Sequence, residues 1–318
     1  MKFSIIIPIL NAEKTLQSCL ESVIKLDYPS DQYEIICVDN GSTDRSLSII
    51  RQFKNICLLQ EHRSKSSYLA RSTGIGAARG EVLVFTDADC VVPADWLKRF
   101  DEAFQDPQAG AVAGKIVPAP AKTLTEEYQI KREVLSLEGM SVFPFGWLPI
   151  TANAAYRSEL FKTVGPFRDD LISGGDFELG ERIRTQGHYR IITQLDNVVQ
   201  HHHRTSVSAM IRQYTRYGIG RRHLEELRVF QQSVALTCAN PLHYASIYFV
   251  KFLWWAFKVL CSPRFKGDRL KEIAFLWFDF ITELSMRRGY AVALKRHPLN
   301  SGPVRRDVPG EKSSRSGS

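Results

Sequence analysis

Val82-Leu-Val-Phe-Thr-Asp-Ala-Asp89 joins a short apolar run to two carboxylates that stand one residue apart. The run from Val82 to Phe85 is rich in β-forming residues and too short for a helix, so it predicts a buried strand. Ligands of open α/β sheets bind beyond the carboxyl ends of the strands. Two interpretations follow: Asp87 and Asp89 hold a cation or a polar ligand at the strand end, or they are ordinary turn residues.

Similar apolar runs recur upstream, and segments with helical periodicity separate them. Strands are predicted at residues 3–7 (ending at Pro8), 34–38, 56–59 and 82–85, and helices at 16–24 and 67–78. Asn40-Gly41 predicts a turn, after which Ser42 or Thr43 is expected to cap a further helix. The β-α-β-α-β-α-β alternation with short connections predicts an α/β fold with a mostly parallel sheet, covered by helices on both faces.

The pattern continues less regularly beyond Asp89. Helices are predicted at 93–104, 158–164, 176–186 and 207–217, a strand at 110–117, and two edge strands at 189–192 and 197–199. Residues 118–150 give only a polar helical piece and an aromatic turn, Phe143-Pro-Phe-Gly-Trp147, which either lines a ligand site or serves packing.

The 318 residues suffice for one large domain or two small ones, and the hydrophobic fraction of 44% and charged fraction of 24% are ordinary for a soluble globular protein. Six cysteines form no C-x-x-C pair. Cys37 falls in a predicted buried strand, which favours reduced thiols over disulfides or a zinc site. Because a strand follows Met1 almost at once, we expect no secretory signal and a cytoplasmic location.

The net charge of +8 is unevenly distributed: residues 1–203 carry 22 Lys/Arg and 26 Asp/Glu, whereas residues 204–318 carry 20 and 8. A basic C-terminal third is compatible with an anionic membrane surface or with nucleic acid. No nucleic-acid-binding motif accompanies it, so we expect no nucleic-acid partner. We expect three parts: a catalytic domain at 1–217, a basic helical region at 218–297 and a disordered tail at 298–318.

Residues 244–260 and 273–286 are rich in Trp, Phe, Leu and Ile, but each is shorter than the roughly 20 apolar residues of a spanning helix. Two interpretations stay open. The segments are amphipathic helices on the inner face of the cell membrane, with Trp254, Trp255 and Trp277 at headgroup depth, or they are a helical pair buried against the sheet domain.

Polar side chains follow three of the predicted strands: Asn11 and Glu13 after the first, Asp39 after the second, and Asp87 and Asp89 after the fourth. Three groups of polar residues at neighbouring strand ends, which meet at one rim of the sheet, are more typical of a ligand site than of residues with a structural role alone. Carboxylates there suit hydrogen bonds to a ribose or a base, together with Mg²⁺ or Mn²⁺ on a diphosphate.

Three further features have both a structural and a functional interpretation. Asp176 follows two glycines at a predicted helix N-terminus, where the helix dipole is expected to lower its pKa; it is a helix cap or a general base on a glycine hinge. The run His201-His202-His203 either ligates a metal or forms a solvated turn. Arg71 faces a phosphate or a surface carboxylate.

Together these stretches resemble glycosyltransferase family 2, the inverting nucleotide-sugar enzymes with a GT-A fold. They lie in the family's order between residue 3 and about residue 217. They are Ile5-Ile-Ile-Pro8-Ile-Leu-Asn11, Val38-Asp39-Asn-Gly-Ser-Thr-Asp44, Ala70-Arg71-Ser-Thr-Gly74, Phe85-Thr-Asp87-Ala-Asp89 and Gly174-Gly-Asp176-Phe-Glu-Leu179.

The resemblance implies roles for individual residues. Asp176 falls on the family's catalytic base, although Gly175 replaces the usual Glu before it. A divalent metal, Mg²⁺ or Mn²⁺, is implied at Asp89 and Asp87, with His201 or His203 completing the site. The residues implied to line the nucleotide-sugar pocket are Pro8, Asn11, Glu13, Asp39, Asp44, Arg71, Asp87 and Asp89.

Gln213-Tyr-Thr-Arg216-Tyr217 resembles the Q-x-x-R-W of processive polysaccharide synthases, with Tyr217 at the Trp position. The chain shows no strongly hydrophobic channel of the kind those enzymes carry, so non-processive transfer is expected. Gln213 and Arg216 are expected to face the acceptor or the diphosphate.

The hypothesis is sugar transfer from a nucleotide-diphosphate sugar, expected to be a UDP-sugar, to a hydroxyl of a glycan or lipid-linked acceptor, with inversion, in cell-envelope or exopolysaccharide synthesis. One alternative is a catalytically silent nucleotide-sugar-binding or scaffold protein of the same fold. A dinucleotide-binding oxidoreductase is disfavoured, because no G-x-G-x-x-G follows the first predicted strand.

Overall fold

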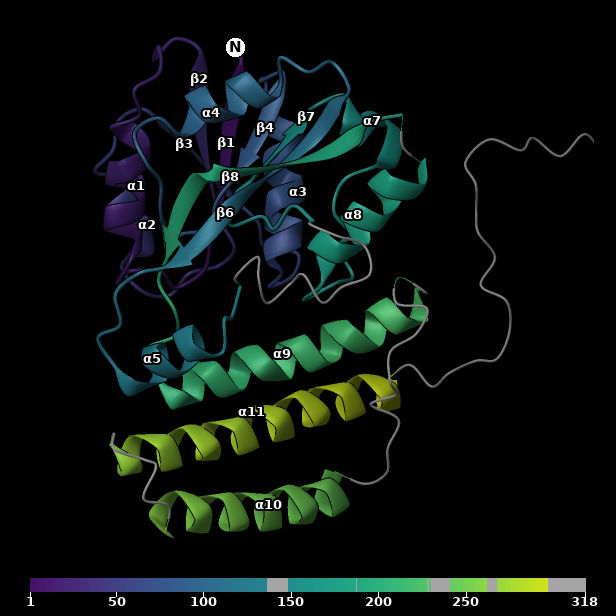
Figure 1. The fold of residues 1–318 in the computed structure, drawn as a ribbon. Helices are drawn as coiled ribbons and strands as arrows, with labels where there is room; N and C mark the ends of the chain where they lie inside the picture. The colour runs from purple at the N-terminus through teal and green to yellow at the C-terminus, as the bar shows by residue number, and fades with distance from the viewer. Residues whose placement is uncertain (136–147, 187, 228, 230–240, 262–267, 297–318) are drawn as a thin grey trace, which may run out of the picture.

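An eight-stranded sheet in the order β3-β2-β1-β4-β7-β6-β8-β5 forms the centre of the molecule (Figure 1). The structure is a computed structural model that describes residues 1–135, 148–186, 188–227, 229, 241–261 and 268–296. Four of the seven strand pairs in these ranges are parallel, as predicted. The strands are β1 (Phe3–Ile9), β2 (Tyr33–Asp39), β3 (Ile56–Gln60), β4 (Val82–Phe85), β5 (Cys90–Val91), β6 (Ala109–Pro118), β7 (Ala154–Arg157) and β8 (Arg190–His201).

Helices cover both faces of the sheet, and further helices lie below its lower end in Figure 1. The predicted aromatic turn at 143–147, Cys238 and the tail 298–318 lie outside the described residues. The helices are α1 (Leu16–Ile24), α2 (Ser46–Ile50), α3 (Ser67–Ala77), α4 (Trp96–Ala103), α5 (Leu124–Lys131), α7 (Leu160–Val164), α8 (Gly175–Gln186), α9 (Val207–Glu226), α10 (Pro241–Cys261) and α11 (Arg269–Arg296).

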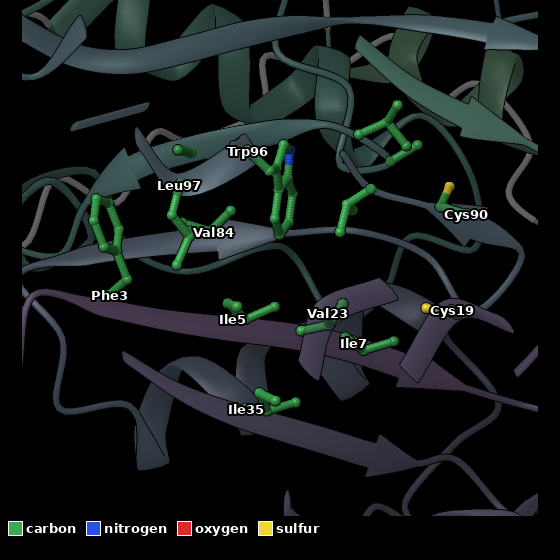
Figure 2. Close-up of a cluster of buried hydrophobic side chains, with 14 of the residues drawn as sticks. Phe3, Ile5, Ile7, Cys19, Val23, Ile35, Val84, Cys90, Trp96 and Leu97 are labelled. Atoms are coloured by element: carbon green, nitrogen blue, oxygen red, sulfur yellow. The ribbon is translucent and has the colours of Figure 1, made fainter. Parts of the chain in front are cut away.

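The apolar side chains of β1 divide between two cores because successive residues of a strand point to opposite faces. Phe3, Ile5 and Ile7 enter a cluster that includes residues of α1 and α4, and Figure 2 shows Val23 of α1 beside them. Ile6 points the other way, into a cluster with residues of α3, α7 and α8. A continuous apolar run is therefore what a strand buried on both faces requires.

Small residues let α3 approach the sheet closely. A Cβ atom at Gly74 would lie 2.5 Å from Cγ2 of Ile6 and 3.3 Å from Cγ2 of Val38. Ala70 is likewise fully buried. The close approach brings the N-terminal half of α3, including Arg71, to the rim at the strand ends.

Pro8 does not end the first strand, which continues to Ile9 and pairs Pro8 with Val38 of β2. Alternate residues of a parallel strand bond to alternate neighbours, and the N–H of Thr86 donates to the carbonyl of Ile6 on the β4 side at 3.4 Å. The nitrogen of Pro8 points to that same side, beyond the last β1–β4 pair at Ile6 and Phe85. The missing N–H therefore costs the sheet no hydrogen bond.

One local expectation was wrong. Ser42 and Thr43 do not cap the next helix: α2 begins at Ser46, whose N–H donates to Oδ1 of Asp44 at 2.9 Å.

The two predicted edge strands are one strand, β8, that lies inside the sheet between β6 and β5. A register shift against β6 separates its two paired parts: Gly114 pairs with Gln194, whereas Lys115 pairs with Val198. The polar residues of this irregular stretch look like a loop in the sequence, which explains the error.

Helix α9 continues to Glu226, so the expected boundary at 217/218 falls inside a continuous helix. It packs on α11, which in turn packs on α10, and the three helices lie in successive layers (Figure 1). Tyr128, Met210, Phe275 and Phe278 form a small core between α5, α9 and α11. Among the described helices, none is both long and apolar enough to cross a membrane.

Candidate active site

The polar residues predicted at the rim do follow neighbouring parallel strands. β1 lies between β2 and β4, with Ile9 opposite Asp39 in the register. Asp39 is 1% exposed, and its carboxylate accepts hydrogen bonds from the N–H groups of Gly41 and Ser42, both at 3.2 Å. Pro8 is buried within β1. Asp39 therefore holds the turn after β2 in place, whatever it also binds.

Asn11 and Glu13 link the loop after β1 to the loop after β2. Oδ1 of Asn11, a residue at φ 52°, accepts from the N–H of Thr43 at 2.8 Å. The backbone N–H of Glu13 donates to Oδ2 of Asp44 at 3.0 Å, and the Glu13 carboxylate accepts a hydrogen bond from Nε of Arg45 at 3.2 Å. These bonds give Glu13 and Asp44 a structural role at the edge of the site.

A chain of buried polar groups connects the D-x-D stretch to Asp176. The guanidinium of Arg71, only 4% exposed, forms an ion pair with the carboxylate of Asp87 through Nη2. The same guanidinium lies over the ring of Tyr68, 5.3 Å from its centroid. The hydroxyl of Tyr68 donates to Oδ2 of Asp176 at 3.3 Å. Arg71 therefore pairs with the half-buried carboxylate of Asp87 at the rim.

Asp176 lies in the first turn of α8 and is 9% exposed. Within the described part of the chain, its Oδ1 accepts no hydrogen bond. Burial raises the pKa of Asp176 above its ordinary value, although Arg71 and the nearby Thr151 oppose the shift. The expectation that the helix dipole lowers this pKa was wrong, because desolvation outweighs it. A buried carboxylate with a raised pKa and a free oxygen is suited to accept a proton.

The glycines before Asp176 have steric reasons to be glycines. Gly174 has φ 84°, a conformation that other residues adopt at a cost. A Cβ atom at Gly175 would lie 2.8 Å from ring carbons of Tyr68. Tyr68 therefore fills the space that the Glu expected from the family pattern would need, and it donates the hydrogen bond to the neighbouring Asp176.

Asp89 lies at a second cluster, where β5 pairs with the end of β8. Its Oδ2 accepts from Nη1 of Arg204 at 2.9 Å, and Oδ1 lies 3.4 Å from Nε2 of His201. The backbone N–H of His202 donates to the carbonyl of Asp89 at 2.8 Å. Burial opposes ionisation, but His201 and Arg204 outweigh it and hold the pKa of Asp89 below its ordinary value.

The histidines beside Asp89 have the chemistry of metal ligands. His201 and His203 are buried, their rings lie 5.1 Å apart, and Nδ1 of each has no hydrogen-bond partner among the described residues. Burial lowers the pKa of His203 to about 4, which keeps its imidazole neutral, the form that binds metals.

Within the described ranges no three His, Cys, Asp or Glu side chains are arranged to hold a metal ion. Mg²⁺ and Mn²⁺ are often held by one or two protein ligands together with substrate phosphates. The unpartnered Nδ1 of buried His203 suits such a metal, whereas both carboxylate oxygens of Asp89 lie against Arg204 and His201 and would have to exchange partners to bind it.

Helix α9 reaches the loop that precedes Asp176. Nη2 of Arg216 donates to the carbonyl of Ile172 at 3.0 Å. Nε2 of Gln213 donates to the hydroxyl of Tyr217 at 2.8 Å. Arg216 therefore supports the Asp176 loop from the helix side.

Tyr68 and Arg204 were not predicted as site residues. Tyr68 lies three residues before Arg71, one helical turn away, and Arg204 directly follows the histidine run. Their positions beside motif residues could have pointed to them. However, neither a Tyr nor an Arg identifies a site residue by its type alone.

Comparisons with known proteins point to one family. The model described as "Glycosyl transferase family 2" matches residues 4–165. Glycosyltransferase AglE of Haloferax volcanii is 31% identical over 223 residues, which cover 68% of this chain and 72% of that protein. A dolichyl N-acetyl-alpha-D-glucosaminyl phosphate 3-beta-D-2,3-diacetamido-2,3-dideoxy-beta-D-glucuronosyltransferase of Methanococcus voltae is 29% identical over 231 residues, covering 68% and 71%.

Two solved structures share the fold. Mannosyltransferase PcManGT from Pyrobaculum calidifontis, in complex with GDP-Man and Mn²⁺, has a TM-score of 0.56 and 20% identity, covering 95% of this chain and 88% of that one. TarS of S. aureus, in complex with UDP-GlcNAc, has a TM-score of 0.51 and 20% identity, covering 93% and 74%.

Proposed function

The chain belongs to glycosyltransferase family 2, and from this we propose that it transfers a sugar from a nucleotide-diphosphate sugar, a UDP-sugar, to a hydroxyl of a glycan or lipid-linked acceptor. The observation that carries the proposal is the chain of contacts from the half-buried Asp87 through the buried Arg71 and Tyr68 to Asp176. The proposal is supported because this chain brings Asp176, whose pKa is raised, close to Arg71, the cation that pairs with Asp87.

In the proposed reaction Asp176 accepts the proton of the acceptor hydroxyl. The acceptor oxygen forms a bond to the anomeric carbon of the donor as the bond from that carbon to the diphosphate oxygen breaks. One displacement of this kind inverts the anomeric configuration. The free oxygen of Asp176, Oδ1, is the atom available to take the proton, because Oδ2 already accepts from Tyr68.

The leaving nucleoside diphosphate gains negative charge, and preorganised cations at that point lower the barrier. Arg71 and Arg204 are the guanidinium groups nearest to the D-x-D carboxylates. A divalent cation held by Asp89 and His203 would supply further charge neutralisation. We propose that Pro8, Asn11 and Asp39 line the nucleotide pocket at the carboxyl ends of β1 and β2.

The proposed catalytic part comprises residues 1–217, and α9 continues across this boundary to Glu226, into the helical region 218–297. Arg216 supports the base loop, so we propose that α9 borders the acceptor side of the site. The M. voltae relative is named for a dolichyl-phosphate-linked substrate, which favours a lipid-linked or cell-envelope acceptor. We propose transfer of single sugars in cell-envelope or exopolysaccharide synthesis.

A panel of nucleotide sugars tests this proposal. We expect one donor, with Mn²⁺ or Mg²⁺, to raise the Tm and to be slowly hydrolysed in the absence of acceptor. Binding without any hydrolysis or transfer would favour the catalytically silent alternative. If no nucleotide sugar changes the Tm with or without metal, the proposal is wrong.

A further inference from the structure

Helix α10 exposes a continuous stripe of apolar side chains. On a helix, residues 250, 253, 254, 257 and 260 lie on one face. The exposed fractions are 64% for Val250, 51% for Leu253, 51% for Trp254, 64% for Phe257 and 52% for Leu260. Single exposed apolar side chains are ordinary on protein surfaces, but a contiguous stripe of this kind marks an interaction site.

One flank of α10 contacts α11, although Phe249 on that flank is still 43% exposed. Phe252 packs edge-on against Trp277 of α11 at 5.5 Å, and Phe249 contacts Phe280 at 6.1 Å, between ring centroids. In Figure 1, α10 is the outermost layer, and its long axis runs alongside α11. With 21 residues the helix is about 31 Å long, so it offers a long, straight ridge to a flat partner.

We propose that this stripe lies in the surface of an anionic lipid bilayer, parallel to the membrane plane. The apolar side chains would enter the boundary between headgroups and acyl chains, and Trp254 would lie at headgroup depth. Nζ of Lys258 lies 3.6 Å from the centroid of the Trp254 ring, at the margin of the stripe, where lipid phosphates would meet it. The proposal goes beyond sugar transfer and does not depend on it.

Charge favours a bilayer over a second copy of the chain. Residues 204–318 carry 20 Lys/Arg against 8 Asp/Glu, so two copies meeting through α10 would bring like charges together. Lys is also depleted in protein–protein interfaces. An anionic surface is complementary to the same charge.

The helices that carry α10 also contact the loop before Asp176. Gly220 of α9 packs against Ser173, and Gly174 packs against Leu224 of α9. On its other side, α9 meets α11: Gly218 lies against the backbone of Met286. The loop before Asp176 therefore rests on the same helical layers that carry α10.

Vesicle flotation of the full chain tests the stripe. We expect binding to phosphatidylcholine vesicles that contain phosphatidylglycerol, and weaker binding at high salt. The triple variant L253A/F257A/L260A should lose roughly a hundredfold in partition coefficient. The matched control Leu195→Ala, on β8 with 54% exposure, should bind as wild type. Thermal melting confirms that each variant is folded.

Charge reversal tests the lipid contact separately. Lys258→Glu should weaken binding to the anionic vesicles about tenfold. Lys162→Glu, the same charge change on α7 at the far side of the molecule in Figure 1, should have little effect. Failure of the wild type to float, or equal flotation of the triple variant, would overturn the proposal. So would a dimer by light scattering that the triple variant dissociates, because a second copy would then cover the stripe.

Discussion

Replacing Tyr68 by Phe should shift the acid limb of the pH–rate profile to higher pH. The hydroxyl of Tyr68 donates to Oδ2 of Asp176 at 3.3 Å and so favours the charged carboxylate. Burial already raises the pKa of Asp176, and loss of the donor raises it further. Hydrogen bonds to charged groups contribute about 1.5–3 kcal/mol. This bond is long, so about 1 kcal/mol is a fair value, which corresponds to roughly 0.5–1 pH unit.

The assay is the pH dependence of kcat with saturating donor and acceptor, for wild type and for the Tyr68→Phe variant. Tyr156→Phe is the matched control. Tyr156 is buried in the same apolar cluster, but its hydroxyl donates to the carbonyl of Pro149 at 3.2 Å. We expect its acid limb to stay in place. An unshifted limb in folded Tyr68→Phe, or a shift to lower pH, would refute the reasoning.

Three further predictions concern sterics and metal. Gly175→Glu, which introduces the residue usual in the family, should lower kcat strongly, because its Cβ would lie 2.8 Å from the Tyr68 ring; a fully active variant would contradict this. Gly218→Ala should lower the Tm by several degrees, because the added Cβ would lie 1.8 Å from the carbonyl oxygen of Met286. The control Gly76→Ala should leave the Tm unchanged, because nothing lies within 4 Å of a Cβ there. Equal Tm values for the two variants would argue against close packing of α9 on α11. A chelator should abolish turnover, and added Mn²⁺ or Mg²⁺ should restore it. The chelator should not change the Tm of the protein without donor, because the protein alone offers the metal few ligands. Full activity in the presence of the chelator would exclude the metal role.

The sheet was predictable because its strands are signalled locally. A strand buried on both faces has to be a continuous apolar run, and the stretches that begin at Phe3 and Val82 are such runs. The middle of β8 was not predictable in this way. Its register shift against β6 places polar residues inside the strand. These residues interrupt the alternation of apolar and polar side chains, so the sequence pattern predicts two separate strands.

The acidic residues of the candidate site could be predicted from the sequence, but the residues that hydrogen-bond to them could not. Asp87, Asp89 and Asp176 stand next to strand ends or glycines, which are local signals. Tyr68 and Arg204 join them across 108 and 115 residues of sequence, so only the fold shows those contacts. The direction of the Asp176 pKa shift depends on burial, which the sequence position at a helix N-terminus does not reveal.

The role of Asp176 is tested most directly by the Asp176→Asn variant, with sugar transfer and donor affinity measured side by side. Asn has nearly the same shape but cannot accept the acceptor proton. We expect transfer to fall by on the order of 10²–10⁴, with donor affinity and fold retained, whereas Asp169→Asn, a change at an exposed residue, should transfer normally. Near-normal transfer by folded Asp176→Asn would contradict the assignment of Asp176 as the base.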